Sequence, residues 1–451
     1  MAAEKNFLGY IDDNKKRAYA KLVLVAIALI VIGINIFTGY EYNKILLTVT
    51  ALSALIMLSM SLYMVSDNWY GVIIIGVIMV SVYSAWAECM DSYLFGSAQS
   101  ISLTHIAMRG MVIMCEFSLV VMLCIRKRIH KISSEDRISS KEIFNPIIVY
   151  GLIAVLLFIF VFGYKRPTVP GERGEISTLY EYSVILFIMG FMYSGRKWYT
   201  VLPLTAVALA YCAQDLLYGG RRTSLAIMIL LFLVLLSHKL VFVKMIPVAL
   251  VGFLLLSVVG LFRGGVAFSF DQLMATFGDL FSKKFAIDTM YSAYYTGTAF
   301  VAAAHEGLFD FSDRIEMFFK FLASLVLGGG AIPNSNLPLV VRKYIDHWYG
   351  GMFPMYGYFY LGTLGTVICG ATTGFFAGSS SKKIFSTQLG RVLITWICTN
   401  VFAWFLYSPF PLLRGSALVI IAYFVCMLGD IISKKLLKLI FKFEFKTANS
   451  K

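Results

Sequence analysis

Long apolar runs recur along most of this chain and are separated by short polar segments. A run of about 17–25 apolar residues is long enough for a helix to cross the hydrocarbon core of a bilayer. Twelve runs are predicted to span a membrane: 22–38, 44–66, 70–87, 104–125, 145–163, 178–194, 199–217, 223–237, 245–262, 354–378, 392–408 and 415–432. The pattern therefore predicts an all-α polytopic membrane protein with about 12 transmembrane helices.

One long interval, residues 263–353, is the only large segment outside the predicted spans. Its stretch DRIEMFFKFLASLVL, residues 313–327, carries charges at helical spacing and then turns apolar. This pattern predicts a helix that lies on the bilayer surface or re-enters it. The predicted organisation is nine transmembrane helices, one large external loop with interfacial helices, three transmembrane helices and a basic tail: 1–262, 263–353, 354–432 and 433–451.

The chain carries too few charges for a soluble protein of its size. Of its 451 residues, 59% are hydrophobic and 14% are charged, whereas soluble domains carry about 25% charged residues. The net charge of +14 would suggest a nucleic-acid partner in a soluble protein. In a membrane protein it is explained by the Lys and Arg residues of cytoplasmic loops. We therefore expect no nucleic-acid partner.

The distribution of the basic residues predicts the orientation in the membrane. With the N-terminus in the cytoplasm, the predicted inner segments hold 24 of the 39 Lys and Arg residues, and the short outer loops hold 7. Another 7 lie in the interval 263–353, and Arg109 lies within a span. Because basic residues gather on the cytoplasmic side, both termini are expected in the cytoplasm. The long interval is then the outer, periplasmic loop.

The sequence lacks the signatures of several enzyme classes and of metal sites. Its seven cysteines are scattered, and no CxxC pair or Cys/His ligand spacing occurs, so neither a disulfide nor a zinc site is predicted. P-loop, DxD and HExxH motifs are absent, which gives no support to an ATPase, a cytoplasmic nucleotide-sugar transferase or a metalloprotease. We expect no metal and no cofactor.

Arginine recurs on the predicted outer side, often beside glycine at a span boundary. GGRRTS places Arg221 and Arg222 at the start of a span, and Arg263, Arg342 and Arg414 lie on the same side. Guanidinium binds phosphate oxygens in a planar fork, while glycine and a helix N-terminus offer backbone N–H groups to an anion. The alternative is that these arginines snorkel and anchor helix ends. Since the positive-inside rule disfavours this side, we favour an anionic ligand for Arg221 and Arg222.

Few outer residues have the chemistry of a general acid or base. His347 stands beside Asp346 in YIDHWYGG, and Glu306 follows His305 in the middle of the same interval. An unperturbed histidine titrates near neutral pH, so His347 is a candidate for activating a hydroxyl group. The alternative is that it belongs to an interfacial aromatic belt with Trp348.

Some charged residues lie within predicted spans, where each costs about 2.5–3.5 kcal/mol at the middle of the bilayer. Arg109 and Glu116 are seven residues apart and share one helix face, and Glu181 and Asp215 lie toward the outer ends of their spans. These residues either form structural pairs, or Glu181 and Asp215 line an outer cavity near Arg221.

The combination of these features resembles the bacterial O-antigen and oligosaccharide repeat-unit polymerases, the Wzy-type membrane glycosyltransferases. The resemblance lies in the twelve-span plan, in GGRRTSL at the opening of a span, and in a long outer loop that leads to GGMFPMYGYFYLGTLG, residues 350–365. It implies a GT-C-like fold. The first outer loop, GYEYN, offers only Glu41, which departs from glycosyltransferases with a catalytic acid in a long first loop and favours the polymerase and ligase branch.

The resemblance implies a reaction on the outer face of the bacterial cytoplasmic membrane. A glycan on undecaprenyl pyrophosphate is transferred to an incoming lipid-linked repeat unit, which builds an O-antigen (lipopolysaccharide), capsule or exopolysaccharide. A flippase and a chain-length regulator are implied as partners. Pyrophosphate contacts carry over to Arg221 or Arg222 and Arg263, with Arg342 and Arg414 as further candidates. The acceptor hydroxyl would be activated by His347, Asp346 or Glu306.

Two alternatives stay open. An O-antigen ligase has a similar plan and also uses an outer-loop histidine, which His347 would supply. A transporter or flippase of lipid-linked oligosaccharides is also often built from twelve spans, but transporters commonly have two similar halves with a site at the middle of the membrane.

Overall fold

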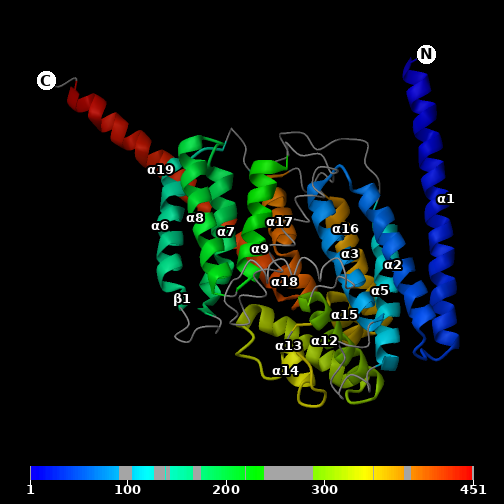
Figure 1. Cartoon of the computed structure of the whole chain (residues 1–451). Helices are drawn as coiled ribbons and strands as arrows, with labels where there is room; N and C mark the ends of the chain where they lie inside the picture. The colour runs from blue at the N-terminus through cyan, green and yellow to red at the C-terminus, as the bar shows by residue number, and fades with distance from the viewer. Residues whose placement is uncertain are drawn as a thin grey trace, which may run out of the picture. The chain divides into compact units, whose positions relative to one another are not determined.

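The computed structural model describes residues 2–90, 104–125, 138, 143–165, 174–218, 220–237, 288–348, 350–379 and 387–448. Within these residues the chain is almost entirely helical (Figure 1). The exception is a small ribbon, in which β1 (Tyr164–Lys165) pairs antiparallel with β2 (Glu175–Ile176). The predicted all-α class is therefore confirmed for the described part of the chain.

In the part of the chain that the structure describes, six helices contain segments that are long and apolar enough to cross a membrane. They are α1 (Ala2–Phe37), α2 (Lys44–Met64), α3 (Trp69–Met90), α5 (Thr104–Cys124), α8 (Trp198–Leu217) and α19 (Phe410–Ala448). Shorter apolar helices are α6 (Pro146–Phe162), α7 (Thr178–Tyr193), α16 (Thr363–Ser379), and α9 (Arg222–Leu231) with its π-helical continuation η2 (Phe232–Leu236). These helices identify a helical membrane protein. The predicted span 245–262 lies outside the described residues.

The chain forms two compact units, each assembled from segments that are distant in sequence. Unit 1 comprises residues 1–129, 280–379 and 401–410, and unit 2 comprises residues 130–279, 380–400 and 411–451.

Unit 1 is built around α5, which packs against α2 and α16. Small residues permit the close approach, because a Cβ added to Gly374 of α16 would lie 2.7 Å from Cβ of Cys124. Close packing at small residues is a common way for helices to associate in a membrane.

The predicted outer interval 263–353 contains a helix that packs against two of the predicted spans. This helix, α12 (Asp288–His305), contacts α3 and α5. Tyr294 of α12 is fully buried, and its hydroxyl donates a hydrogen bond to the carbonyl of Ala107, 2.6 Å away. The described part of this interval is therefore folded onto unit 1.

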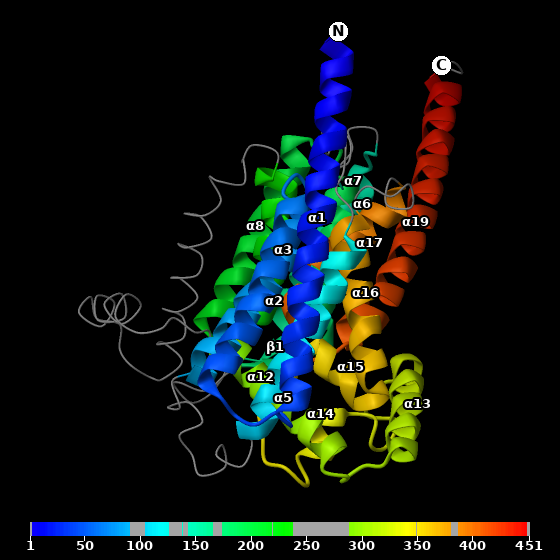
Figure 2. The same cartoon turned by 90° about the vertical axis from the view of Figure 1, so that its right-hand side faces the viewer.

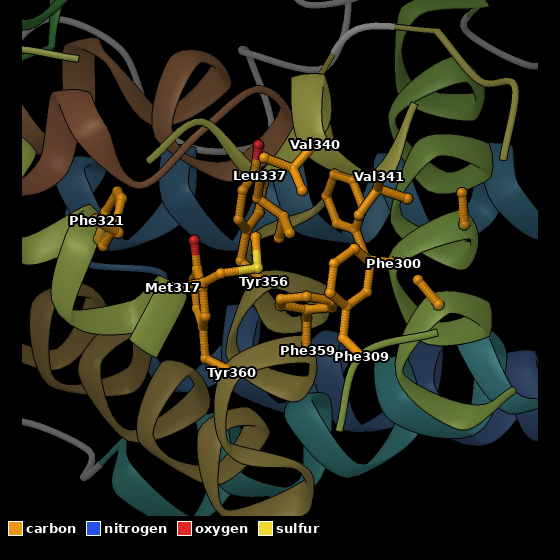
Figure 3. Close-up of a cluster of buried hydrophobic side chains, with 12 residues drawn as sticks. Phe300, Phe309, Met317, Phe321, Leu337, Val340, Val341, Tyr356, Phe359 and Tyr360 are labelled. Carbon is orange, nitrogen blue, oxygen red and sulfur yellow. The ribbon is translucent and has the colours of Figure 1, made fainter. Parts of the chain in front are cut away.

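A hydrophobic cluster joins α12 to three further helices (Figure 3). These are α13 (Phe311–Leu327), α14 (Leu337–Val341) and α15 (Phe353–Leu361). Phe300, Phe321 and Phe359 are at most 5% exposed within it. Figure 2 shows α13 and α14 at the end of unit 1 opposite the N-terminus of α1. The helix predicted over 313–327 is confirmed as α13, and its position on a bilayer stays a prediction.

Two predicted spans are each divided into two helices. That these two segments cross a membrane stays a prediction. The predicted span 354–378 is divided into α15 and α16 by Gly362, whose φ of 64° lies in a region that favours glycine. The predicted span 392–408 is divided into α17 (Gln388–Thr399) and α18 (Val401–Leu406) at Asn400. There the Asn400 side-chain amide donates to the carbonyl of Trp396.

Unit 2 contains α6, α7, α8, α9, α17 and most of α19. Asn145 caps the start of α6, because its side-chain oxygen accepts hydrogen bonds from the backbone of Ile147 and Ile148. Its side-chain amide donates to Asp430 Oδ1 and to Ser433 Oγ, at 2.7 Å each. Asn145 therefore links α6 to α19, whose backbone continues as one helix through the basic tail to Ala448.

Candidate functional site

The first turn of α9 is held by an acidic residue of the preceding helix. Asp215 of α8 is fully buried, and its Oδ2 accepts hydrogen bonds from the backbone N–H and the hydroxyl of Ser224, at 2.9 and 2.7 Å. The Gly220 N–H donates to the Asp215 carbonyl at 2.7 Å. A Cβ at Gly220 would overlap the Asp215 carboxylate, which explains a glycine in this turn.

This arrangement changes the expected role of the helix N-terminus. The sequence predicts that backbone N–H groups of GGRRTS bind an external anion. Asp215 instead supplies the negative charge that the positive end of a helix dipole favours. Its carboxylate also accepts the hydrogen bond from the Ser224 N–H. The guanidinium groups of Arg221 and Arg222 are therefore the groups that this turn offers to a ligand.

Arg222 pairs with Glu181 of α7. Its Nη1 lies 3.1 Å from each carboxylate oxygen, and both side chains are 32% exposed. This contact does not decide between the two alternatives that the sequence left open, because the partner of Glu181 is Arg222 and not one of the other charged residues within predicted spans. A half-buried pair of this kind fixes the direction of the guanidinium group.

Arg414 of α19 belongs to the same neighbourhood. Arg222, Arg414 and Glu181 all act electrostatically on the hydroxyl of Tyr182. The Tyr182 ring stacks on Trp396 of α17, with ring centroids 6.0 Å apart. Unit 2 therefore brings together three predicted arginine positions, because Arg221 directly precedes Arg222 as the N-cap residue of α9.

Trp396 connects α17 to the start of α19. Its Nε1–H donates to the carbonyl of Pro411 at 3.0 Å, and Gly415 packs against its indole ring. Sequence reasoning missed both Trp396 and Tyr182 as parts of this site. Neither residue stands in a charged or glycine-rich motif, so no local pattern could have identified them.

The remaining predicted site residues lie in unit 1. His347 is 3% exposed, its Nδ1–H donates to the carbonyl of Trp348, and its ring packs edge-on against Phe300. Burial lowers the pKa of His347, and the positive charge of Arg342 lowers it further, while the Trp348 carbonyl and Asp346 oppose this effect. The ring is buried, which suits a packing role better than contact with an external hydroxyl.

Arg342, Asp346 and Glu306 are more accessible. Arg342 Nε and Asp346 Oδ1 lie 3.9 Å apart, with side chains 42% and 61% exposed. Such exposed pairs contribute at most about 1 kcal/mol to stability. Glu306 Oε1 lies 3.9 Å from Nε2 of His105. These two carboxylates, unlike His347, are open to a ligand.

The predicted site is therefore distributed over the two units. Unit 2 groups Arg221, Arg222 and Arg414, whereas Arg342, Asp346, His347 and Glu306 belong to unit 1. Arg263 lies outside the described residues. Among the residues that the structure describes, no three His, Cys, Asp or Glu side chains are placed to hold a metal ion.

Comparison with known proteins gives no relative. No protein-family model, no curated protein and no solved structure matches this chain.

Proposed function

We propose that this protein polymerises undecaprenyl-pyrophosphate-linked repeat units into a surface polysaccharide, as a metal-independent glycosyltransferase. The observation that supports the proposal is the group of cationic side chains around Tyr182, with Arg222 and Arg414 on different helices and Arg221 adjacent. Arginine binds phosphate oxygens in a bidentate fork. The group suits the pyrophosphate of a lipid-linked donor.

The chemistry needs such a group of cations. Transfer breaks the bond between the sugar and the pyrophosphate, so negative charge gathers on the leaving group. Positive groups held in place beforehand stabilise this charge in the transition state. Glu181 keeps the Arg222 guanidinium oriented until a more highly charged pyrophosphate competes for it.

The acceptor side of the proposal rests on Glu306 and Asp346. Both carboxylates are about half exposed, whereas His347 is buried. A carboxylate that accepts the proton of the acceptor hydroxyl would act as a general base. The ligase and the flippase remain the alternative functions.

The finer membrane plan is part of this proposal. We propose twelve spans in a GT-C-like arrangement, in the bacterial cytoplasmic membrane with both termini in the cytoplasm. The count of 24 basic residues in predicted inner segments against 7 in short outer loops supports this orientation. The substrates are two undecaprenyl-pyrophosphate-linked oligosaccharides, and the partners are a flippase and a chain-length regulator.

Deletion of the gene from its host tests the reaction. The surface glycan is then separated by size. Loss of a polymerase leaves chains of a single repeat, loss of a ligase leaves long chains on the lipid carrier, and loss of a flippase keeps repeat units on the inner face. Intact long surface chains in the deletion strain would refute the proposal.

A double-mutant cycle that neutralises the charges of Arg222 and Glu181 tests the arginine site. Arg222→Gln is expected to abolish polymerisation, and the same loss is expected in the double variant Arg222→Gln with Glu181→Gln. If Arg222 only neutralised Glu181, the double variant would regain activity. Lys165→Gln, which breaks the exposed pair with Glu175 at 3.0 Å in the same unit, is the control and is expected to polymerise normally.

A further inference from the structure

A second group of polar and aromatic side chains lies where α5 begins and α12 ends. His105 and Arg109 are one turn apart on α5, and His305 ends α12, directly before Glu306. The four side chains interact: Glu306 lies 3.9 Å from His105, and the charges of Arg109, His105 and Glu306 all act on His305. This group belongs entirely to unit 1 and is distinct from the arginine site of unit 2.

A loop residue in an unusual backbone conformation holds Arg109 in place. The guanidinium carbon of Arg109 lies 4.3 Å from the ring centroid of Tyr40, a cation–π contact. Tyr40 has a φ of 62° and follows Gly39, whose φ is 65°. A non-glycine residue in this region costs about 1–3 kcal/mol and occurs most often at functional sites. Tyr358 of α15 acts electrostatically on the same tyrosine.

The helices under this group are locked together. Gly110 of α5 packs against Thr298 and Tyr294 of α12, and a Cβ at this position would lie 2.8 Å from Thr298 Cγ2. The hydroxyl of Tyr294 also donates to the carbonyl of Ala107. Side chains carried by two clamped helices are preorganised for a ligand.

The group combines hydrogen-bond donors with an acceptor, and part of it is exposed to solvent. Arg109 and the histidines can donate hydrogen bonds, Glu306 can accept them, and the Tyr40 ring lies against Arg109. His105 and Glu306 have side chains 52% and 46% exposed. An exposed histidine–glutamate contact contributes little to stability, so folding alone does not account for this combination.

The balance of charge favours a ligand with many hydroxyl groups over an anion. Within the described residues of this group, the carboxylate of Glu306 balances the permanent positive charge of Arg109. A sugar hydroxyl both donates and accepts, and a sugar ring packs on aromatic side chains. We propose that His105, Arg109, His305 and Glu306, with Tyr40, form a sugar-binding site. The sugar that we assign to this site belongs to the acceptor repeat unit, and this assignment rests on the proposed function.

The host that lacks the gene supplies the probe. Its single-repeat glycan, released from the lipid by mild acid, is a soluble oligosaccharide without phosphate. Its affinity for the purified full-length protein is measured by calorimetric titration. Hydrogen bonds to charged groups are worth about 1.5–3 kcal/mol, so Glu306→Gln and Arg109→Gln are each expected to weaken binding about 10- to 100-fold.

A matched variant and a second ligand make the test specific. Glu316→Gln, which removes an exposed acid paired with Lys320 in the same unit, is expected to bind the oligosaccharide as the wild type does. Equal binding in Glu306→Gln and Arg109→Gln, with unchanged thermal unfolding, would overturn the sugar site and leave the polymerase proposal intact. Loss of undecaprenyl-pyrophosphate binding in Arg109→Gln, without oligosaccharide binding in the wild type, would also overturn it. Long chains in the deletion strain would refute both proposals.

Discussion

Arg222 illustrates how the role of a charged residue here depends on its partners. Its position at the start of a span, beside two glycines, could be predicted from the sequence. Its pairing with Glu181 and its proximity to Tyr182 could not, because these residues lie about 40 positions earlier in the chain. Local spacing predicts neighbours on one helix, and it contains no information about which helices meet.

The first prediction at the scale of single residues concerns Asp215. Asp215→Ala removes both hydrogen bonds to Ser224 and leaves the buried N–H of the α9 first turn without its acceptor. The expected loss of stability is about 1–3 kcal/mol, measured as a lower midpoint of thermal unfolding in detergent. Ser224→Ala keeps the backbone hydrogen bond and is expected to cost less. An unchanged midpoint in Asp215→Ala would contradict the capping role.

The burial of His347 predicts that the stability of the folded protein depends on pH. Burial holds the pKa of the folded protein's His347 below its ordinary value of 6.5. As the pH falls through that value, the unfolded chain binds a proton that the folded protein resists, so stability falls. Unfolding midpoints of the wild type are expected to drop between pH 7.5 and 5.5.

The variant His347→Gln separates this histidine from other titrating groups. It is expected to show a smaller drop over the same pH range, because the buried titrating group is gone. Identical pH profiles for the wild type and the variant would show that His347 does not carry the effect.

At the scale of elements, the length of the apolar runs predicted the positions of the helices well. It did not predict where one helix ends and the next begins within a run. α2, α6, α7 and α8 lie within a few residues of the predicted spans. The turns at Gly362 and Asn400 were missed because the residues around them are apolar or small, and hydropathy does not change there. α12 was not predicted as a helix, since its tyrosine, threonine and serine residues mask its buried character.

A substitution at Gly362 tests the role of the turn between α15 and α16. A Cβ at this position would meet no atom within 4 Å, so Gly362→Ala acts through its φ of 64° alone. The expected cost is about 1–3 kcal/mol, read from thermal unfolding. Gly378→Ala, within α16 and with ordinary contacts to Ile125, is expected to change stability by less than about 0.5 kcal/mol. Equal effects of the two variants would rule out backbone strain at Gly362.

At the scale of the whole molecule, the distribution of basic residues predicts the sidedness of the membrane protein. Alkaline phosphatase is active only outside the cytoplasm, and green fluorescent protein fluoresces when it folds inside. Fusion of the phosphatase after Asn334, in the loop before α14, is expected to be active. Fusion of the fluorescent protein after Lys451 is expected to fluoresce. An active phosphatase at Lys451 would contradict the proposed even number of spans, which places both termini in the cytoplasm.

The division of the chain into units has a consequence for biosynthesis. Unit 1 includes α18, whose Trp404 and Phe405 are fully buried although they are encoded after most of the chain. Unit 1 is therefore complete only after residues 401–410 have left the ribosome. Unit 2 resumes at Pro411 and is completed later still. Termination before Val401 therefore leaves both units without part of their core.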